Sequence, residues 1–241
     1  MTVELLMGAS GYGKTYNLYK RITEEALANP EKRYLLIVPE QSTLQAQKDI
    51  VRMHPNGGVF NIDVLSFGRF AYRIFEELCV ELNETIDDTG KMLIIRKVVN
   101  QVADRLKVIR ISNKFGIISE IKSMLSEFKQ YGITPDGLES IINDTKGSER
   151  LKEKLSDVLI IYREFEKYIE NKFVTVEDKP EELLKVIDKS SFFEGALVAF
   201  DGFTGFTPVQ YRIVERIIEK AERVICTVTF PADMDYNTTL E

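Results

Sequence analysis

Short apolar runs alternate with longer stretches of helical spacing along most of the 241-residue chain. The apolar runs predict buried strands at residues 3–7, 33–39, 59–65, 196–200 and 224–230. Apolar residues three or four positions apart predict helices at residues 16–27, 42–53, 66–80 and 208–221. Strands that alternate with helices favour a parallel sheet with crossover helices, so the pattern predicts an α/β fold.

Residues 84–191 differ, because they contain helical spacings and no convincing strand pattern. Helices are predicted at residues 90–108, 112–131, 134–142, 147–173 and 180–189. Asp87 or Asp88 lies near the start of the first, and Pro135 occupies the first turn of the third. We interpret residues 84–191 as an inserted all-helical subdomain, and residues 1–83 and 192–241 as a discontinuous core.

The first predicted strand leads into GASGYGKT at residues 8–15, and a predicted helix follows. This order fits the phosphate-binding pattern G-x-x-x-x-G-K-[ST], although a glycine-rich turn can match it by chance. Glycines let backbone N–H groups approach phosphate oxygens, and a helix N-terminus favours the same anion. The residues predicted to line this nucleoside triphosphate site are Gly8, Ser10, Gly11, Tyr12, Gly13, Lys14 and Thr15. Lys14 is expected to reach the β- and γ-phosphates, and the Thr15 hydroxyl is expected to bind Mg²⁺.

Asp201 directly follows the apolar run ALVAF at residues 196–200. An acid at the end of such a strand can hold Mg²⁺ directly or through water. The alternative is a strand-end Asp that caps the next turn. Gly202 stands where many ATPases carry an acid that polarises the attacking water, and nothing in the sequence places Glu40 or Glu194 there. ATP binding is therefore predicted without a secure catalytic residue.

Composition narrows these possibilities. A net charge of −6 argues against a uniformly basic nucleic-acid binder but permits a local basic groove. The two cysteines, Cys79 and Cys226, form no CxxC pair and His54 is the single histidine, which predicts buried free thiols and no zinc or iron–sulfur site from this chain alone. No run approaches transmembrane length and no signal-peptide pattern precedes residue 8, so a cytoplasmic protein is expected. The short tail after the last predicted strand suggests part of a longer protein.

Four stretches together resemble the AddB family, one of the two kinds of chain in the bacterial AddAB helicase–nucleases. They read GASGYGKT, LLIVPEQSTLQAQ, VLSFGRFAYRIFEEL and FDGFTGFTPVQ, and the resemblance covers essentially the whole chain. It implies a P-loop NTPase domain of RecA-like, superfamily 1 helicase 1A type, with a 1B-like insertion and with ATP and Mg²⁺ as cofactors. It also implies processing of DNA double-strand ends for recombinational repair, a heterodimer with an AddA-type partner, and a role in recognising the Chi sequence. The family's nuclease domain and iron–sulfur cluster would belong to a part beyond this chain.

The chain departs from active superfamily 1 helicases at the motif after the fourth strand, where Asp201 is followed by Gly202 instead of Glu. A degenerate motor is therefore expected. The adenine-reading Gln has no place upstream of residue 8, which leaves the base selectivity open. The residues that match the segments in contact with DNA in such helicases are Gln41, Ser42, Thr43 and Ser66. For Ser42, Thr43 and Ser66 helix N-capping is the alternative, and for the neighbouring Phe67 core packing is favoured.

Two other functions remain open at this point. In a P-loop nucleotide or small-molecule kinase, the insertion would form a lid over the acceptor. The insertion is larger than an ordinary lid and no tight arginine cluster follows it, which disfavours this function. In a purely structural P-loop domain, nucleotide would only support an assembly.

Overall fold

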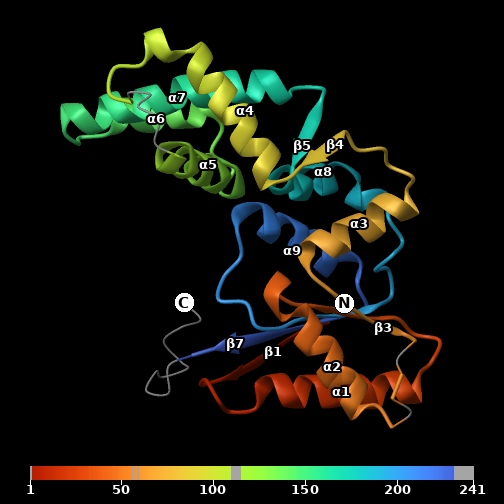
Figure 1. Cartoon of the computed structure of the whole chain (residues 1–241). Coiled ribbons are helices and arrows are strands. Elements are labelled where there is room, and N and C mark those ends of the chain that lie inside the picture. The colour runs from red at the N-terminus through yellow and green to blue at the C-terminus, as the bar shows by residue number, and fades with distance from the viewer. Residues whose placement is uncertain (1, 56, 59, 110–114, 231–241) are drawn as a thin grey trace. The chain divides into compact units, whose positions relative to one another are not determined.

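The computed structural model describes residues 2–55, 57–58, 60–109 and 115–230. The chain divides into two compact units (Figure 1). The first consists of Met1–Val80, Glu182–Phe206 and Gln210–Glu241, and the second of Glu81–Glu181 with Thr207–Val209. Each unit has a core of its own and is described separately.

A five-stranded sheet forms the centre of the first unit, in the order β1-β7-β6-β2-β3. Its strands are β1 (Thr2–Gly8), β2 (Tyr34–Ile37), β3 (Ile62–Leu65), β6 (Leu197–Phe200) and β7 (Arg223–Thr229). Every neighbouring pair is parallel, and β1 is joined to β7 with Thr2 opposite Arg223. The α/β fold with a parallel sheet is therefore confirmed.

Helices cover both faces of this sheet, as parallel strands with crossover connections require. On one face lie α1 (Lys14–Ala28) and α2 (Thr43–Met53), and on the other α3 (Phe67–Glu77) and α9 (Pro208–Lys220) (Figure 1). The core beneath α1 and α2 joins Leu18, Ile22 and Ile50 to strand residues such as Leu36. Short 3₁₀ turns at Glu40–Ser42 and Ile187–Lys189 and the helix α8 (Lys179–Val186) complete the connections.

The second unit contains α4 (Asp88–Gln101), α5 (Phe115–Gln130), α6 (Pro135–Asp144) and α7 (Glu149–Ile169). Their buried faces meet in one core that includes Ile95, Val98, Val158 and Phe165. The prediction of an all-helical insertion is wrong, because β4 (Glu84–Ile86) and β5 (Phe173–Thr175) pair as a parallel two-stranded sheet. Strands of three residues are too short to show an alternating pattern in the sequence.

Helix starts in the second unit follow the capping signals of the sequence. The Asp87 side chain accepts a hydrogen bond from the Gly90 N–H at 2.7 Å, and Pro135 occupies the first turn of α6. The predicted helix over residues 90–108 is shorter, because α4 ends at Gln101 and a 3₁₀ turn follows at Ala103–Arg105. The predicted helix start at residues 112–114 lies outside the described residues. No helix in the described part of the chain is both long and apolar enough to cross a membrane.

Buried charges of the second unit are held by specific partners. The Lys91 side chain, 3% exposed, donates to both Glu177 carboxylate oxygens at 2.7 Å and to Ser126 at 3.0 Å. Burial raises the pKa of Glu177, but the hydrogen bond and charge of Lys91 outweigh it and hold the pKa below its usual range. The buried Asp157 carboxylate accepts from the backbone N–H groups of residues 107–109 at 2.7–3.1 Å. These contacts join segments that are far apart in the sequence.

Candidate functional site

The loop at residues 8–15 connects the carboxyl end of β1 to the first turn of α1. Gly11 and Gly13 have φ angles of 81° and 74°, in the left-handed region that favours glycine. Gly13 takes the N-cap position of α1 and supplies no side-chain cap, so the first backbone N–H groups of the helix keep their hydrogen-bonding capacity. A helix N-terminus of this kind suits an anion, which agrees with the pattern read from the sequence.

The Lys14 side chain curls over this loop. Its Nζ donates to the carbonyl oxygens of Gly8 and Ala9, at 2.9 Å each. Gly8 and Ala9 are buried, while Ser10 and Tyr12 are exposed. The positive charge is therefore held at the mouth of the loop, beside the helix N-terminus.

Asp201 follows β6 and approaches the same helix start. The Thr15 hydroxyl donates to Asp201 Oδ1 at 3.2 Å, and the two residues are 186 positions apart in the chain. A hydroxyl that gives its proton to a carboxylate keeps its oxygen lone pairs available, and hard cations such as Mg²⁺ prefer oxygen ligands. The pair therefore fits a Mg²⁺ ion chemically, with Thr15 and Asp201 as the residues that would hold it.

Two residues that the sequence did not single out also hold Asp201, which is 4% exposed. The Thr227 hydroxyl of β7 donates to Asp201 Oδ1 at 2.7 Å. Burial, together with the charge of Asp201 and a hydrogen bond to it, raises the pKa of the Tyr19 hydroxyl. Thr227 and Tyr19 come from separate elements, so only the hydroxyl within the buried strand 223–229 could have been a signal for one of them.

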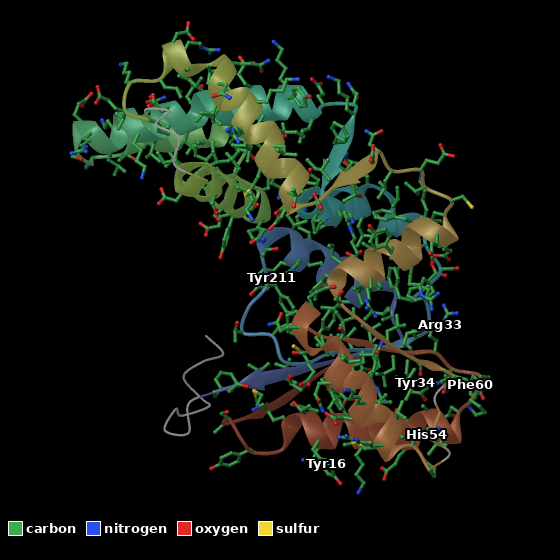
Figure 2. The ribbon with its side chains drawn as sticks, in the orientation of Figure 1. Tyr16, Arg33, Tyr34, His54, Phe60 and Tyr211 are labelled. Carbon is green, nitrogen blue, oxygen red and sulfur yellow. The ribbon has the colours of Figure 1, made fainter. Side chains whose placement is uncertain are left out.

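The segment after Asp201 is anchored by aromatic rings. Phe203 and Phe206 pack against each other with centroids 5.0 Å apart, and both contact Phe67. Phe67 is 8% exposed and also stacks on Phe200, which confirms its predicted role in the core. Tyr211 of α9 meets Phe206 edge to face at 5.5 Å, and its position is marked in Figure 2. The rings fix the path of the chain that carries Asp201.

Other acids differ in their position relative to this site. Glu194 precedes β6 and pairs with Lys220 at 3.6 Å, at the edge of the sheet opposite to Asp201. Glu40 follows β2 and is exposed at the same edge as Asp201, whose N–H donates to the Ile37 carbonyl. Gly202 carries no side chain and has a φ of 76°. Glu40 is therefore the acid, of these two, that shares the edge with Lys14 and Thr15.

The candidate DNA residues follow β2 and β3, whose carboxyl ends adjoin each other. Ser66 is buried and accepts from the Arg69 N–H at 3.3 Å, so it caps α3. Ser42 occupies the N-cap position of α2 without a side-chain cap bond, and the Thr43 hydroxyl donates to the Glu40 carbonyl at 2.9 Å. Gln41 is exposed. Contact of these four residues with DNA stays a prediction.

The cysteines only partly follow the expectation of buried thiols. Cys79 is exposed and has a φ of 51°, in the turn that ends α3. Cys226 is half-buried on β7, and burial together with the nearby charge of Asp201 raises the pKa of its thiol. Both thiols are free.

Comparison with known proteins identifies relatives over almost the full length of the chain. A family model described as "ADDB, N-terminal" matches residues 5–240. The AddB-type component of the "ATP-dependent helicase/deoxyribonuclease" of Lachnoclostridium phytofermentans is 41% identical over 230 residues, which are 95% of this chain and 20% of that protein. The proteins of the same name from Clostridium novyi and Alkaliphilus metalliredigens are 34% and 32% identical over 98% of this chain and 20% of their own length. The chain thus spans about a fifth of these relatives, and it belongs to the AddB N-terminal family.

Proposed function

We propose that this chain is the ATP-binding, helicase-like N-terminal domain of the AddB component in an ATP-dependent helicase–nuclease. The observation that carries the proposal is the convergence of Lys14, Thr15 and Asp201 at the carboxyl edge of a parallel sheet. Ligands of open α/β sheets bind at this edge. The family membership and the names of the relatives support the same assignment. We extend it to a P-loop, RecA-like fold of the superfamily 1 helicase 1A type, with Glu81–Glu181 as the 1B-like insertion.

In this proposal the chain binds and orients nucleotide more than it hydrolyses it. Lys14 and the N-terminus of α1 would contact the phosphates, and Thr15 with Asp201 would hold Mg²⁺. A bound Mg²⁺ would supply charge neutralisation between the phosphate oxygens. Gly202 offers no acid to polarise water, so turnover in the isolated chain is expected to be weak. The motor work would then fall to a partner of the AddA type, and the assembly would process DNA ends in the cytoplasm, with Chi recognition as a role of the AddB component.

The decisive experiment measures equilibrium binding of ATP·Mg²⁺ to the chain and to Lys14→Ala, with turnover recorded on the same samples. Lys20→Ala is the matched control, because Lys20 lies on α1 outside the loop and pairs with Glu24 at 3.8 Å. We expect Lys14→Ala to weaken binding at least tenfold and Lys20→Ala to leave it unchanged. Fast, DNA-stimulated turnover that depends on Lys14 would overturn the degenerate motor, and phosphoryl transfer to an acceptor would favour a kinase instead.

A further inference from the structure

The edge strand β3 keeps hydrogen-bonding groups that its neighbour β2 does not use. In its parallel register with β2, the Tyr34 N–H bonds to the Asn61 carbonyl and the Val38 N–H to the Leu65 carbonyl. Because backbone groups alternate in direction along a strand, Asp63 and Leu65 face β2, while Ile62 and Val64 direct their N–H and C=O groups away from the sheet. An open strand edge of this kind can pair with an added strand.

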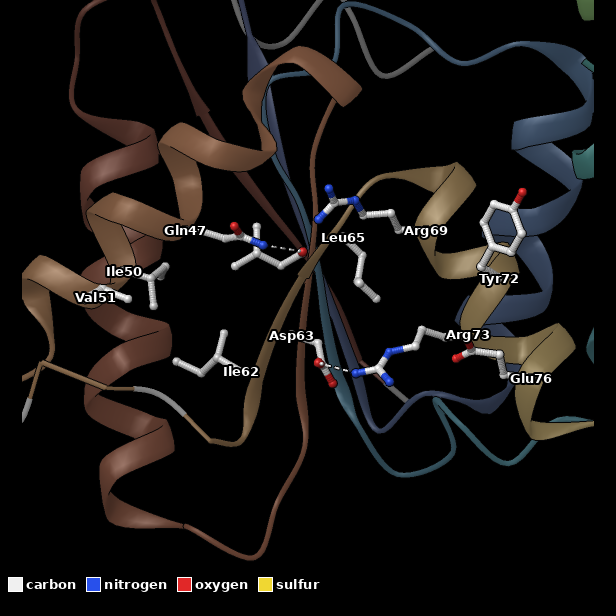
Figure 3. Close-up of a pocket in the computed structure, with 11 residues that line it drawn as sticks. Gln47, Ile50, Val51, Ile62, Asp63, Leu65, Arg69, Tyr72, Arg73 and Glu76 are labelled. Atoms are coloured by element: carbon white, nitrogen blue, oxygen red, sulfur yellow. Dashed lines mark hydrogen bonds and ion pairs between the residues drawn. The ribbon is translucent and has the colours of Figure 1, made fainter. Parts of the chain in front are cut away.

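Two helices wall this edge and turn it into a groove of about 600 Å³. Gln47, Ile50 and Val51 of α2 line one side, and residues of α3 line the other (Figure 3). The side of α3 presents Arg69, Tyr72, Arg73 and Glu76. The floor of the groove is therefore backbone, and its walls are mixed apolar and polar side chains.

The charges along the groove are unequal in their pairing. Arg73 donates to the Asp63 carboxylate at 3.3 Å, so these two charges compensate each other. The Arg69 guanidinium, which extends over the groove (Figure 3), has no acceptor among the residues that the structure describes. Gln47 Nε2 donates to the Val64 carbonyl at 3.4 Å, a long bond that an incoming N–H can replace. The end of the groove near Arg69 thus offers a cation beside exchangeable backbone groups.

We propose that this groove binds an extended peptide segment with an acidic side chain, which adds to β3 as a further strand. The peptide backbone would pair with Ile62 and Val64, and its carboxylate would meet Arg69 in a charge-assisted hydrogen bond. A nucleic-acid strand fits less well, because it has no alternating amide donors and acceptors and because Asp63 and Glu76 repel phosphates. The site lies along the strand edge, apart from Lys14 and Asp201 at the carboxyl ends.

Selection of phage-displayed random decapeptides on the 241-residue chain tests the proposal. We expect enrichment of sequences that alternate β-branched residues and carry Asp or Glu. A synthetic peptide from the enriched set should shift the amide NMR signals of Ile62 and Val64. Replacing its acid by Lys, or N-methylating the amides that face β3, should weaken binding at least tenfold.

Arg69→Glu is the matched test in the protein, with Arg52→Glu as the control, because Arg52 is exposed on α2 and does not line the groove. We expect Arg69→Glu to lower affinity for the acidic peptide at least tenfold, to favour the Lys peptide, and to leave nucleotide binding unchanged. The proposal is overturned if no sequence is enriched, or if enriched peptides bind Arg69→Glu equally well. It is also overturned if oligothymidylate binds the groove through Arg69 more tightly than the peptide does.

Discussion

Asp201 is held by three hydroxyl groups: those of Thr15 and Tyr19 on α1 and that of Thr227 on β7. Hydroxyl donors allow a buried carboxylate to stay charged without a fixed cation nearby. A site that must accept and release a metal needs such neutral support, since a permanent Lys or Arg partner would compete with the ion.

The Thr227→Val variant tests this support. It keeps the shape of the side chain but removes the donor to Asp201, and hydrogen bonds to charged groups contribute about 1.5–3 kcal/mol. We expect the free energy of unfolding to fall by about that amount, measured by urea denaturation followed by circular dichroism. Thr229→Val is the control, because Thr229 is exposed at the end of β7 and should change stability by less than about 0.5 kcal/mol. An equal loss in both variants would mean that Asp201 does not depend on the Thr227 hydroxyl.

Gly202 raises a second question at this scale, namely whether an acid placed there would restore hydrolysis. Its φ of 76° is unfavourable for side chains, and an added Cβ would lie 3.6 Å from Pro39 Cδ, an ordinary contact. We expect Gly202→Glu to lose about 1–2 kcal/mol of stability through backbone strain. Gly202→Asn should lose less, because Asn tolerates this conformation. Turnover should not rise in Gly202→Glu, and a large gain in ATPase rate would show that only the missing acid limits the chemistry.

Lys14, Thr15 and Asp201 could be identified from the sequence because each belongs to a local pattern: a glycine-rich loop or the end of an apolar strand. Thr227 and Tyr19 could not. Thr227 stands in a strand where a hydroxyl has no distinctive spacing, and Tyr19 fits the apolar face of α1. Their role depends on which strands become neighbours, and no short pattern encodes that.

At the scale of elements, the predicted helices and strands of the first unit correspond to observed ones, because long periodic segments carry a strong signal. The misses are short or interrupted. β4 and β5 pair through three residues each, from positions almost ninety apart in the chain. Their existence depends on that pairing, so neither segment reveals it alone.

The link between α4 and the 3₁₀ turn at Val176–Asp178 depends on the buried Lys91–Glu177 pair. We expect Lys91→Met to lower the free energy of unfolding by about 3–5 kcal/mol at pH 7, because it leaves the Glu177 charge buried and unpaired. The double variant Lys91→Met with Glu177→Leu should recover most of the loss. Urea denaturation of both variants and the parent measures the effect.

The same variant should show a defined pH dependence. The pKa of Glu177 is lowered in the folded chain, so the pair contributes stability above about pH 4.5, the usual pKa of a Glu side chain, and loses it as the pH falls further. The difference between Lys91→Met and the parent should therefore shrink in acid. A difference that stays constant down to about pH 3 would contradict the assignment to this ion pair.

At the scale of the whole molecule, two units with separate cores predict two unfolding transitions. The proposed nucleotide site lies entirely in the first unit, so ATP·Mg²⁺ should stabilise that transition alone. At about one hundred times Kd the gain is about 2.7 kcal/mol. Differential scanning calorimetry with and without ATP·Mg²⁺ measures both transitions, and Lys14→Ala is the control that should abolish the shift. A shift of both transitions together would contradict independent units.

The pairing of β1 with β7 has a consequence for how the protein is made. Thr2 lies opposite Arg223, so the first strand to leave the ribosome has its observed neighbour among the last residues of the chain. Contacts of such long sequence separation form slowly, and an unpaired strand exposes its backbone meanwhile. Residues 81–181, contiguous in the chain, can assemble while β1 still waits. The loop that ends β1 can therefore gain its final shape only when synthesis has passed β7, which makes a competent nucleotide site a late event in the life of each new chain.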